Sequence, residues 1–201
     1  MTTQYSATHR TNAMTQLNTD IGINAVIKVF TGSAPATCAT ADTGTLLVTF
    51  AGNATQFGTV AGGVLTASAV ASATASGAGV GAYYRIYPAA ATTINAVTQG
   101  TVFQNTPLVT SALTAANGNV LTFAATTGVA VGMTVSGAGV LAGTTVSSFT
   151  GTTVTMSQTS TAGVGSGVTI TFSGDVVLTN TNIAANQTCN FTSLTVTAAG
   201  A

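Results

Sequence analysis

Charged side chains are nearly missing from this sequence. Three basic and three acidic residues make up 3% of the 201 residues, and the formal net charge is zero, whereas ordinary soluble domains contain roughly 25% charged residues. Three cations cannot neutralise many phosphates, and phosphate neutralisation supplies most of the non-specific affinity of proteins for nucleic acid. Nucleic acid is therefore excluded as a partner.

Because charge is scarce, the polarity of the surface has to come from Thr, Ser, Asn and Gly. Such a surface can be soluble, but it provides little electrostatic repulsion between copies of the chain. The composition is compatible with an isolated, adhesive β module. It favours the alternative, which is a subunit of a dense assembly.

The residue types that carry acid–base, nucleophilic and metal chemistry are equally rare. His9 is the only histidine, and the only carboxylate side chains are Asp20, Asp42 and Asp175. A catalytic triad needs a histidine with an orienting carboxylate, and glycosidases use paired carboxylates around one cleft. No CxxC or HxxxH spacing suggests a zinc site, and the glycines of 163–167 lack the Lys-Ser/Thr of a phosphate loop, so turns explain them better. We expect no enzymatic activity, including polysaccharide degradation, no metal and no cofactor.

Long apolar runs are also missing. None approaches the roughly 20 residues of a membrane span, and the first ten residues lack the basic and apolar regions of a secretory signal. We therefore expect no membrane partner and no export by that route. In the absence of export, Cys38 and Cys189 are predicted to be reduced structural thiols rather than a disulfide.

What the sequence has in abundance is short runs that alternate apolar and polar residues, most clearly in residues 131–172. Apolar residues recur at every second position, which is the period of a half-buried strand; they are Met133 and Val135, Val154 and Met156, and Val168, Ile170 and Phe172. Glycines separate the runs because glycine reaches positive φ at little cost. Together with the change of character at Pro107, the pattern predicts a small antiparallel β-sandwich or barrel over residues 108–172.

The segments on either side, 1–107 and 173–201, predict a second domain that the first one interrupts. A short amphipathic helix is expected at 8–21, with Ser6 or Thr8 as its N-cap and Gly22 as its stop; its apolar stripe consists of Ala13, Met14, Leu17 and Ile21.

β-rich runs in the same segments predict strands, at 25–30, 45–50, 64–71, 82–87, 97–103, 175–179 and 191–197. Residues 36–44, 72–81 and the stretch around 58–63 are predicted to be loops. The fold class is thus mainly β, with a β-sandwich or jelly-roll-like host domain, a short N-terminal helix and an inserted β domain.

One strand carries the residues that look most functional. In the run 82–87, Tyr83, Arg85 and Tyr87 share one face. Tyr and Arg are enriched in the centres of protein interfaces, so this face is a possible subunit interface. The alternative is local stacking of Arg85 on the tyrosines, with Asp42 or Asp175 as its partner, and the sequence does not decide between the two.

Several short motifs follow one another in a recognisable order. An amphipathic helix ends in Ile-Gly at 21–22, and an apolar strand at 25–30 and a Gly-x-x-Pro-Ala turn at 32–36 follow. The later motifs are Gly-x-Leu-Leu at 44–47, Phe-Gly at 57–58, Gly-Val at 63–64, Tyr-Arg-Ile at 84–86, Asn-Ile-Ala-Ala at 182–185 and a Thr/Val strand at 193–197. This order resembles a widespread group of small structural proteins of tailed bacteriophages, over residues 1–105 and 173–201.

The middle of the chain departs from that compact pattern. It separately resembles a β-repeat common in phage tail fibres and decoration proteins, through Gly-Met-x-Val-x-Gly-x-Gly-Val at 132–140, Gly-Thr-x-Val at 143–146 and Val-Thr-Met-Ser at 154–157.

The two resemblances imply a virion structural protein. The first expectation is a capsid decoration or cement protein, made in the bacterial cytoplasm and located on the capsid surface. It would bind the major capsid protein and further copies of itself, as a homo-oligomer in which a trimer is favoured over a dimer. The alternative is a tail or head-fibre component that contacts the host surface.

Overall fold

The computed structural model describes residues 5–53, 57–68, 70–89, 96–104, 106–174 and 176–197. The chain divides into two compact units: unit 1 comprises Met1–Phe103 with Asp175–Ala201, and unit 2 comprises Gln104–Gly174. The boundaries predicted at 108 and 172 fall inside strands β9 (Thr106–Val109) and β14 (Thr169–Ser173). These two strands pair with each other, so unit 2 extends a few residues further at both ends.

Unit 1 begins with helix α1 (Ala7–Ile21), as the sequence predicts. Of the two possible caps, Ser6 is the one used: its side chain accepts a hydrogen bond from the His9 backbone N–H at 3.2 Å. Gly22 ends the helix at φ +68°, and its N–H donates to the Asn18 carbonyl at 3.0 Å. The predicted apolar stripe is narrower than expected, because Ile21 is buried but Ala13 is exposed.

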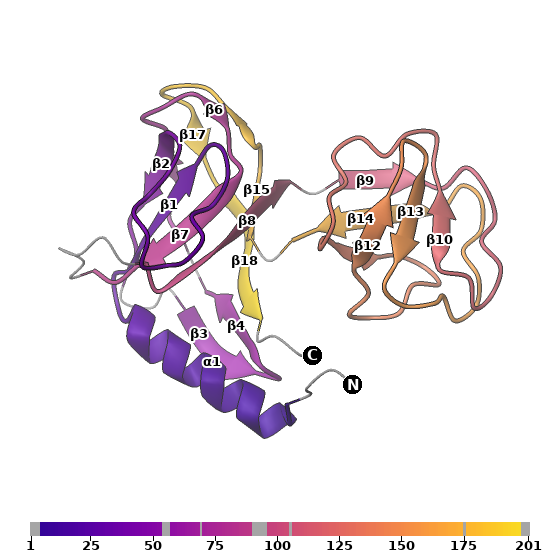
Figure 1. Ribbon diagram of the computed structural model, residues 1–201, viewed down its shortest axis with the longest axis horizontal. Coiled ribbons are helices and arrows are strands. Elements are labelled where there is room, and N and C mark those ends of the chain that lie inside the picture. Colours follow the sequence, from indigo (N-terminus) through magenta and orange to yellow (C-terminus); the bar gives the residue numbers. More distant parts are fainter. Residues whose placement is uncertain are drawn as a thin grey trace. The chain divides into compact units, whose positions relative to one another are not determined.

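The main element of unit 1 is one eight-stranded sheet that curls into a half-barrel (Figure 1). In spatial order its strands are β2 (Leu46–Phe50), β1 (Val26–Phe30), β7 (Tyr83–Tyr87), β8 (Thr98–Gln104), β15 (Val176–Leu178), β18 (Phe191–Thr197), β4 (Val64–Ala67) and β3 (Phe57–Ala61). The mainly β class is confirmed, but the two facing sheets of a sandwich or jelly roll are not.

Two predicted loops prove to contain strands. The stretch around 58–63 includes β3, and residues 72–81 include β5 (Ala73–Thr74) and β6 (Gly79–Val80), which pair with β17 (Thr188–Cys189) and β16 (Asn182–Ile183). Ser76 and Gly77 donate their backbone N–H groups to the Leu47 carbonyl on edge strand β2. The approach is close enough that a Cβ on Gly77 would lie 2.5 Å from the Leu46 oxygen. Much of this stretch is exposed, as predicted, but Ala75 is buried and the close approach at Gly77 leaves no room for a side chain there.

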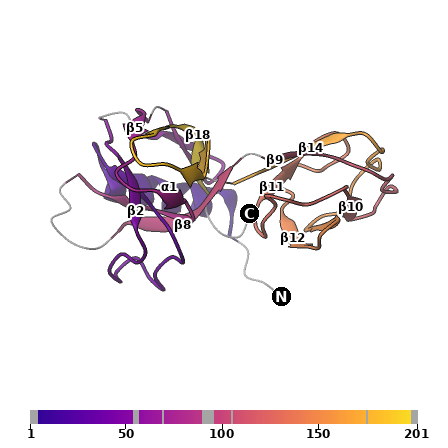
Figure 2. The same cartoon turned by 90° about the horizontal axis from the view of Figure 1, so that it is seen from above.

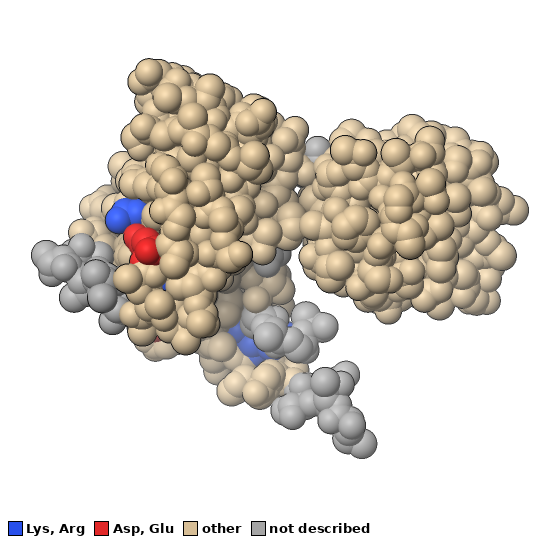
Figure 3. All heavy atoms as spheres, turned by 45° about the horizontal axis from the view of Figure 1, so that its top comes forward, with Lys and Arg blue, Asp and Glu red and all other residues tan. Residues whose placement is uncertain are grey.

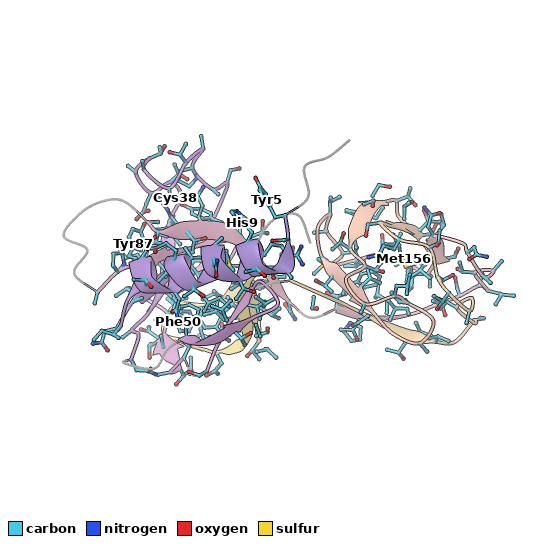
Figure 4. The ribbon with its side chains drawn as sticks, turned by 90° about the horizontal axis from the view of Figure 1, so that it is seen from below. Tyr5, His9, Cys38, Phe50, Tyr87 and Met156 are labelled. Atoms are coloured by element: carbon cyan, nitrogen blue, oxygen red, sulfur yellow. The ribbon has the colours of Figure 1, made fainter. Side chains whose placement is uncertain are left out.

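The hydrophobic core of unit 1 combines side chains of the sheet with Ile21 of α1, and Met14 and Leu17 of the same helix pack against it; α1 also contacts β3 and β4. Phe50 packs against Phe191 with ring centroids 4.2 Å apart (Figure 4). The fully buried members from the first half of the chain are Ile21, Ala25, Ile27, Val29, Leu47, Val48, Phe50, Leu65 and Ile86. Apolar burial of this kind contributes about 25 cal/mol per Å² and drives the packing of the sheet.

Unit 2 consists of two three-stranded sheets that close into a ring (Figures 1 and 2). One sheet contains β10 (Val120–Thr122), β13 (Thr153–Met156) and β12 (Val146–Phe149), and the other contains β11 (Thr134–Ser136), β14 and β9. Isolated bridges between Thr110 and Phe123 and between Thr134 and Thr145 join the two sheets at both seams. Of the two architectures left open by the sequence, the small barrel is the one that forms, and closure protects strand edges from unwanted pairing.

The interior of unit 2 combines apolar side chains with buried hydroxyls. Phe123 and Phe172 meet edge to face, 5.6 Å apart, and Met156 points inward (Figure 4). The hydroxyl of Thr110 donates to the Gly165 carbonyl at 2.6 Å and accepts from the Val168 N–H at 3.0 Å. A threonine can thus satisfy loop backbone groups inside the barrel without introducing a charge.

Within the part of the chain that the structure describes, no helix has the length and apolar character needed to cross a membrane.

Candidate functional site

The face of unit 1 that carries the candidate residues is the outer side of β1, β7 and β8. Arg85 lies directly opposite Lys28 on β1 and Gln99 on β8. Residues opposite one another in an antiparallel pair share a face, so these three side chains form a row across the sheet. The alternate residues Tyr84 and Ile86 point into the core of unit 1.

A loop covers this row. Residues 31–45, which connect β1 to β2, place four acceptors around the Arg85 guanidinium; the most distant is the Thr37 carbonyl, 3.5 Å from Nη2. Nη1 donates to the Thr40 carbonyl at 2.9 Å and pairs with Asp42 Oδ1 at 2.5 Å, while Nη2 donates to the Cys38 carbonyl at 2.5 Å. The planar fork of arginine suits several oxygens at once, which a lysine ammonium does not. Arg85 is 0% exposed, whereas the Asp42 side chain is 33% exposed.

The neighbouring side chains fasten the same loop at further points. The Tyr83 hydroxyl donates to the Thr43 carbonyl and accepts from the Thr43 N–H, and its ring stacks on Phe30 with centroids 5.0 Å apart. The Tyr87 hydroxyl donates to Asp42, and the Gln99 amide donates to the Pro35 carbonyl at 2.7 Å. The loop is thus held along its whole length.

This arrangement corrects the prediction of a subunit interface at Tyr83, Arg85 and Tyr87. Their exposed fractions are 2%, 0% and 4%, so the loop leaves them no surface to offer another subunit. The alternative applies, with Asp42 as the partner of Arg85; the other suggested partner, Asp175, lies outside the described residues. The alternation correctly placed three residues on one face but gave no information about what covers it.

Two contributors were not anticipated. Gln99 and the carbonyls of 36–44 complete the shell around Arg85, although that segment was predicted only as a loop. The sequence contained one sign that this loop could contact Arg85, because Asp42 lies in the loop and is the only carboxylate between Asp20 and Asp175. Lys28, expected to be a solvated strand residue, is half-buried, and its Nζ lies 4.6 Å from the centre of the Tyr87 ring.

The Tyr87 phenol is a group in unit 1 that we expect to respond to alkaline pH. Burial, followed by the hydrogen bond to Asp42 and the charge of Asp42, raises the pKa of Tyr87 above its usual value of 10.0. A raised pKa contributes stability that is fully present below the unfolded pKa and is lost as pH rises above it. Burial also raises the pKa of the Cys189 thiol, which acts in the same direction.

We therefore expect the melting temperature of unit 1 to fall as pH rises from 9 to above 10, and Tyr87→Phe to weaken that fall. Calorimetry of the whole chain at a series of pH values measures it, with Tyr5→Phe as an exposed-tyrosine control. Unit 2 contains no ionisable side chain, so its own transition should stay constant. An equal alkaline shift in wild type and Tyr87→Phe would contradict this role for Tyr87.

The remaining ionisable residues of unit 1 that the structure describes lie apart from one another. His9 stacks on Tyr5 at the start of α1, with ring centroids 4.9 Å apart (Figure 4), and Asp20 accepts from the Gln16 amide at 2.8 Å. Cys38 and Cys189 are both free. Among the described residues, no group of three or more His, Cys, Asp or Glu side chains is placed to hold a metal ion.

Unit 2 has a surface of a different kind. Figure 3 shows its visible face without a charged atom, while the blue and red atoms lie on unit 1. Several large apolar side chains are exposed on unit 2, namely Val109, Leu113, Val120, Val131, Leu141 and Phe149. The chemistry that such a surface offers is apolar contact and hydrogen bonding to hydroxyl and backbone groups.

Comparisons of the chain with protein-family models, with curated proteins and with solved structures each found no match.

Proposed function

We propose that the chain is a virion structural protein, a capsid decoration or cement protein that stabilises the major capsid lattice. Unit 1 attaches to the particle and unit 2 is displayed. The observation that carries the proposal is that the chain leaves unit 1 after β8 and returns at β15, two hydrogen-bonded neighbours in the sheet. A compact unit placed in one strand connection leaves the rest of unit 1 available for attachment, since surface connections tolerate insertions.

The scarcity of charge supports a salt-resistant mode of attachment. The ion pair of Arg85 and Asp42 holds an internal loop and is not available to a partner. Strand β3 lies at one edge of the sheet. Charged residues and proline discourage the pairing of an edge strand with another chain, and β3 contains neither. We therefore assign attachment to apolar packing and to backbone pairing at strand edges, a recognised mode of protein recognition.

The proposal predicts that the protein stays on purified particles in about 1 M salt, where the Debye length is near 3 Å and exposed ion pairs are screened. Mild denaturant should release it, because it weakens apolar burial. The measurement is quantitative mass spectrometry of particles before and after each wash. Release by salt alone would show that charge holds the protein in place.

Copy number in the same measurement separates the two structural roles. Hundreds of copies per particle are expected for a capsid surface protein, whereas small multiples of three or six would assign the chain to the tail or a head fibre. Absence from purified particles would overturn the proposal. As a matched variant, the chain with 104–174 replaced by a short Gly/Ser link should still bind, because loop closure depends only weakly on loop length.

The proposed role is non-catalytic. It predicts that the pure protein releases no sugar from host envelopes, and reducing-end assays measure this directly. Sugar release that is lost in Asp42→Asn or Asp20→Asn, with folding retained by circular dichroism, would place the protein among enzymes instead.

A further inference from the structure

The loops at one end of the unit 2 barrel form an apolar surface. Gln104 and Gly174 mark the end where the chain enters and leaves, and the loops 110–118, 137–143 and 160–168 gather at the other. Thr114 and Val164 exchange two backbone hydrogen bonds of 2.8 and 2.9 Å, and a Cβ on Gly139 would lie 2.4 Å from the Gly163 oxygen. The three loops therefore support one another at close range.

Alanine and leucine make up eight of the fifteen exposed residues on these three loops, and the others are Gly, Ser, Thr and Asn. We call it the leucine end and define it by Ala112, Leu113, Ala115, Ala138, Leu141 and Ala142, all of which are exposed. Leu113 is 73% exposed, the largest value among the exposed large hydrophobic residues. Exposed apolar side chains that gather on adjoining loops are typical of interaction sites.

The absence of charged side chains from unit 2 restricts which kind of partner surface can cover the leucine end. From 86 to 174 the sequence contains no Lys, Arg, His, Asp or Glu. A partner that buried a charged group here would lose the hydration of that group without gaining a counter-charge, which is strongly unfavourable. The surface therefore matches an uncharged one, and the same end of a second copy has that property and the same chemistry.

We propose that the leucine end of unit 2 binds the leucine end of a second copy of this chain. The contact is isologous, so that one patch meets itself across a two-fold axis. Leu113 is the central anchor, and the surrounding alanines allow the loop backbones to approach closely. This contact is independent of the attachment proposed for unit 1 and can be tested without a particle.

The test is sedimentation velocity of the full chain over a concentration series that extends to about 1 mM, which detects even weak pairs. We expect the weight-average mass to rise with concentration towards twice the monomer mass, and the rise to persist in high salt. Leu113→Lys should weaken the association about tenfold or more, because it removes apolar burial and places two cations at the contact. Leu141→Lys should act in the same direction.

The matched control is Phe149→Lys. Phe149 is 43% exposed and lies at the β12–β13 turn, at the opposite end of the barrel, so its substitution should leave the association unchanged. A wild-type chain that remains monomeric throughout the series would overturn the proposal. So would a dimer that Leu113→Lys leaves intact, or one that Phe149→Lys disrupts as strongly, provided that circular dichroism shows each variant folded.

Discussion

Replacing Arg85 with methionine is expected to destabilise unit 1 by about 3 kcal/mol, the lower end of the range found when one partner of a buried ion pair is removed, because the Asp42 side chain left behind is 33% exposed to water. Methionine fills a similar volume but leaves the carbonyls of Thr40 and Cys38 without their donor. It also leaves the Asp42 carboxylate without its cation. Denaturant titration, followed by the tyrosine fluorescence of unit 1, measures the change.

Two further variants separate charge from geometry at this position. Arg85→Lys keeps the charge but loses the planar fork, so the stability of unit 1 in this variant should lie between those of wild type and Arg85→Met. Asp42→Asn leaves a buried guanidinium without a carboxylate and should also destabilise unit 1. In the double variant Arg85→Met with Asp42→Asn, the loss of unfolding free energy should be smaller than the sum of the two single losses. Additive losses would mean that Arg85 and Asp42 act independently, in contrast to the observed 2.5 Å contact.

The parts of the fold that could be predicted are those in which local pattern and tertiary role agree. The alternation at 82–87 and at 154–156 predicts β7 and β13, which the structure contains, because apolar residues at period two specify a strand whatever its neighbours are. The cap at Ser6 and the stop at Gly22 likewise depend on local hydrogen bonds. In each case the information lies within a few residues of the element.

The elements that were missed are held by distant neighbours. Strands β5 and β6 consist of Ala, Thr, Gly and Val and carry no clear alternation; they form because β16, β17 and the edge of β2 lie beside them. Closure of unit 2 depends on the bridges from Thr110 to Phe123 and from Thr134 to Thr145. The residue pattern of a single strand does not show which distant strand it pairs with, so the sequence could not distinguish a sandwich from a barrel.

The candidate site shows the same limit. The sequence placed Tyr83, Arg85 and Tyr87 on one face and left two interpretations open, contact with another subunit or an internal pair with an aspartate. The decision lies with residues 31–45, whose small and polar side chains give no sign that their carbonyls cover a strand. A face defined by alternation can therefore be covered by a loop of the same chain as well as by another subunit. In a sequence with so few charges, the carboxylate of Asp42 was the one indication of an internal partner for Arg85.

Phe172→Ala is expected to destabilise unit 2 selectively. Phe172 is 0% exposed and meets Phe123 edge to face in the barrel interior. Truncation of a buried phenylalanine typically costs about 3–5 kcal/mol, through lost transfer energy and the cavity left behind, and whole domains are stabilised by only about 5–15 kcal/mol. Because unit 1 has its own core, its stability should change little.

Hydrogen exchange with mass spectrometry resolves the two units in one experiment, since peptides from 104–174 report on unit 2 and the others on unit 1. In Phe172→Ala, protection should fall across 104–174 and remain in β1, β7 and β18. Phe149→Ala is the matched control, because that ring is 43% exposed and its loss should cost well under 1 kcal/mol, as is usual for surface positions. A parallel loss of protection in both units would mean that they unfold as one cooperative body, and the separate-core description would then be wrong.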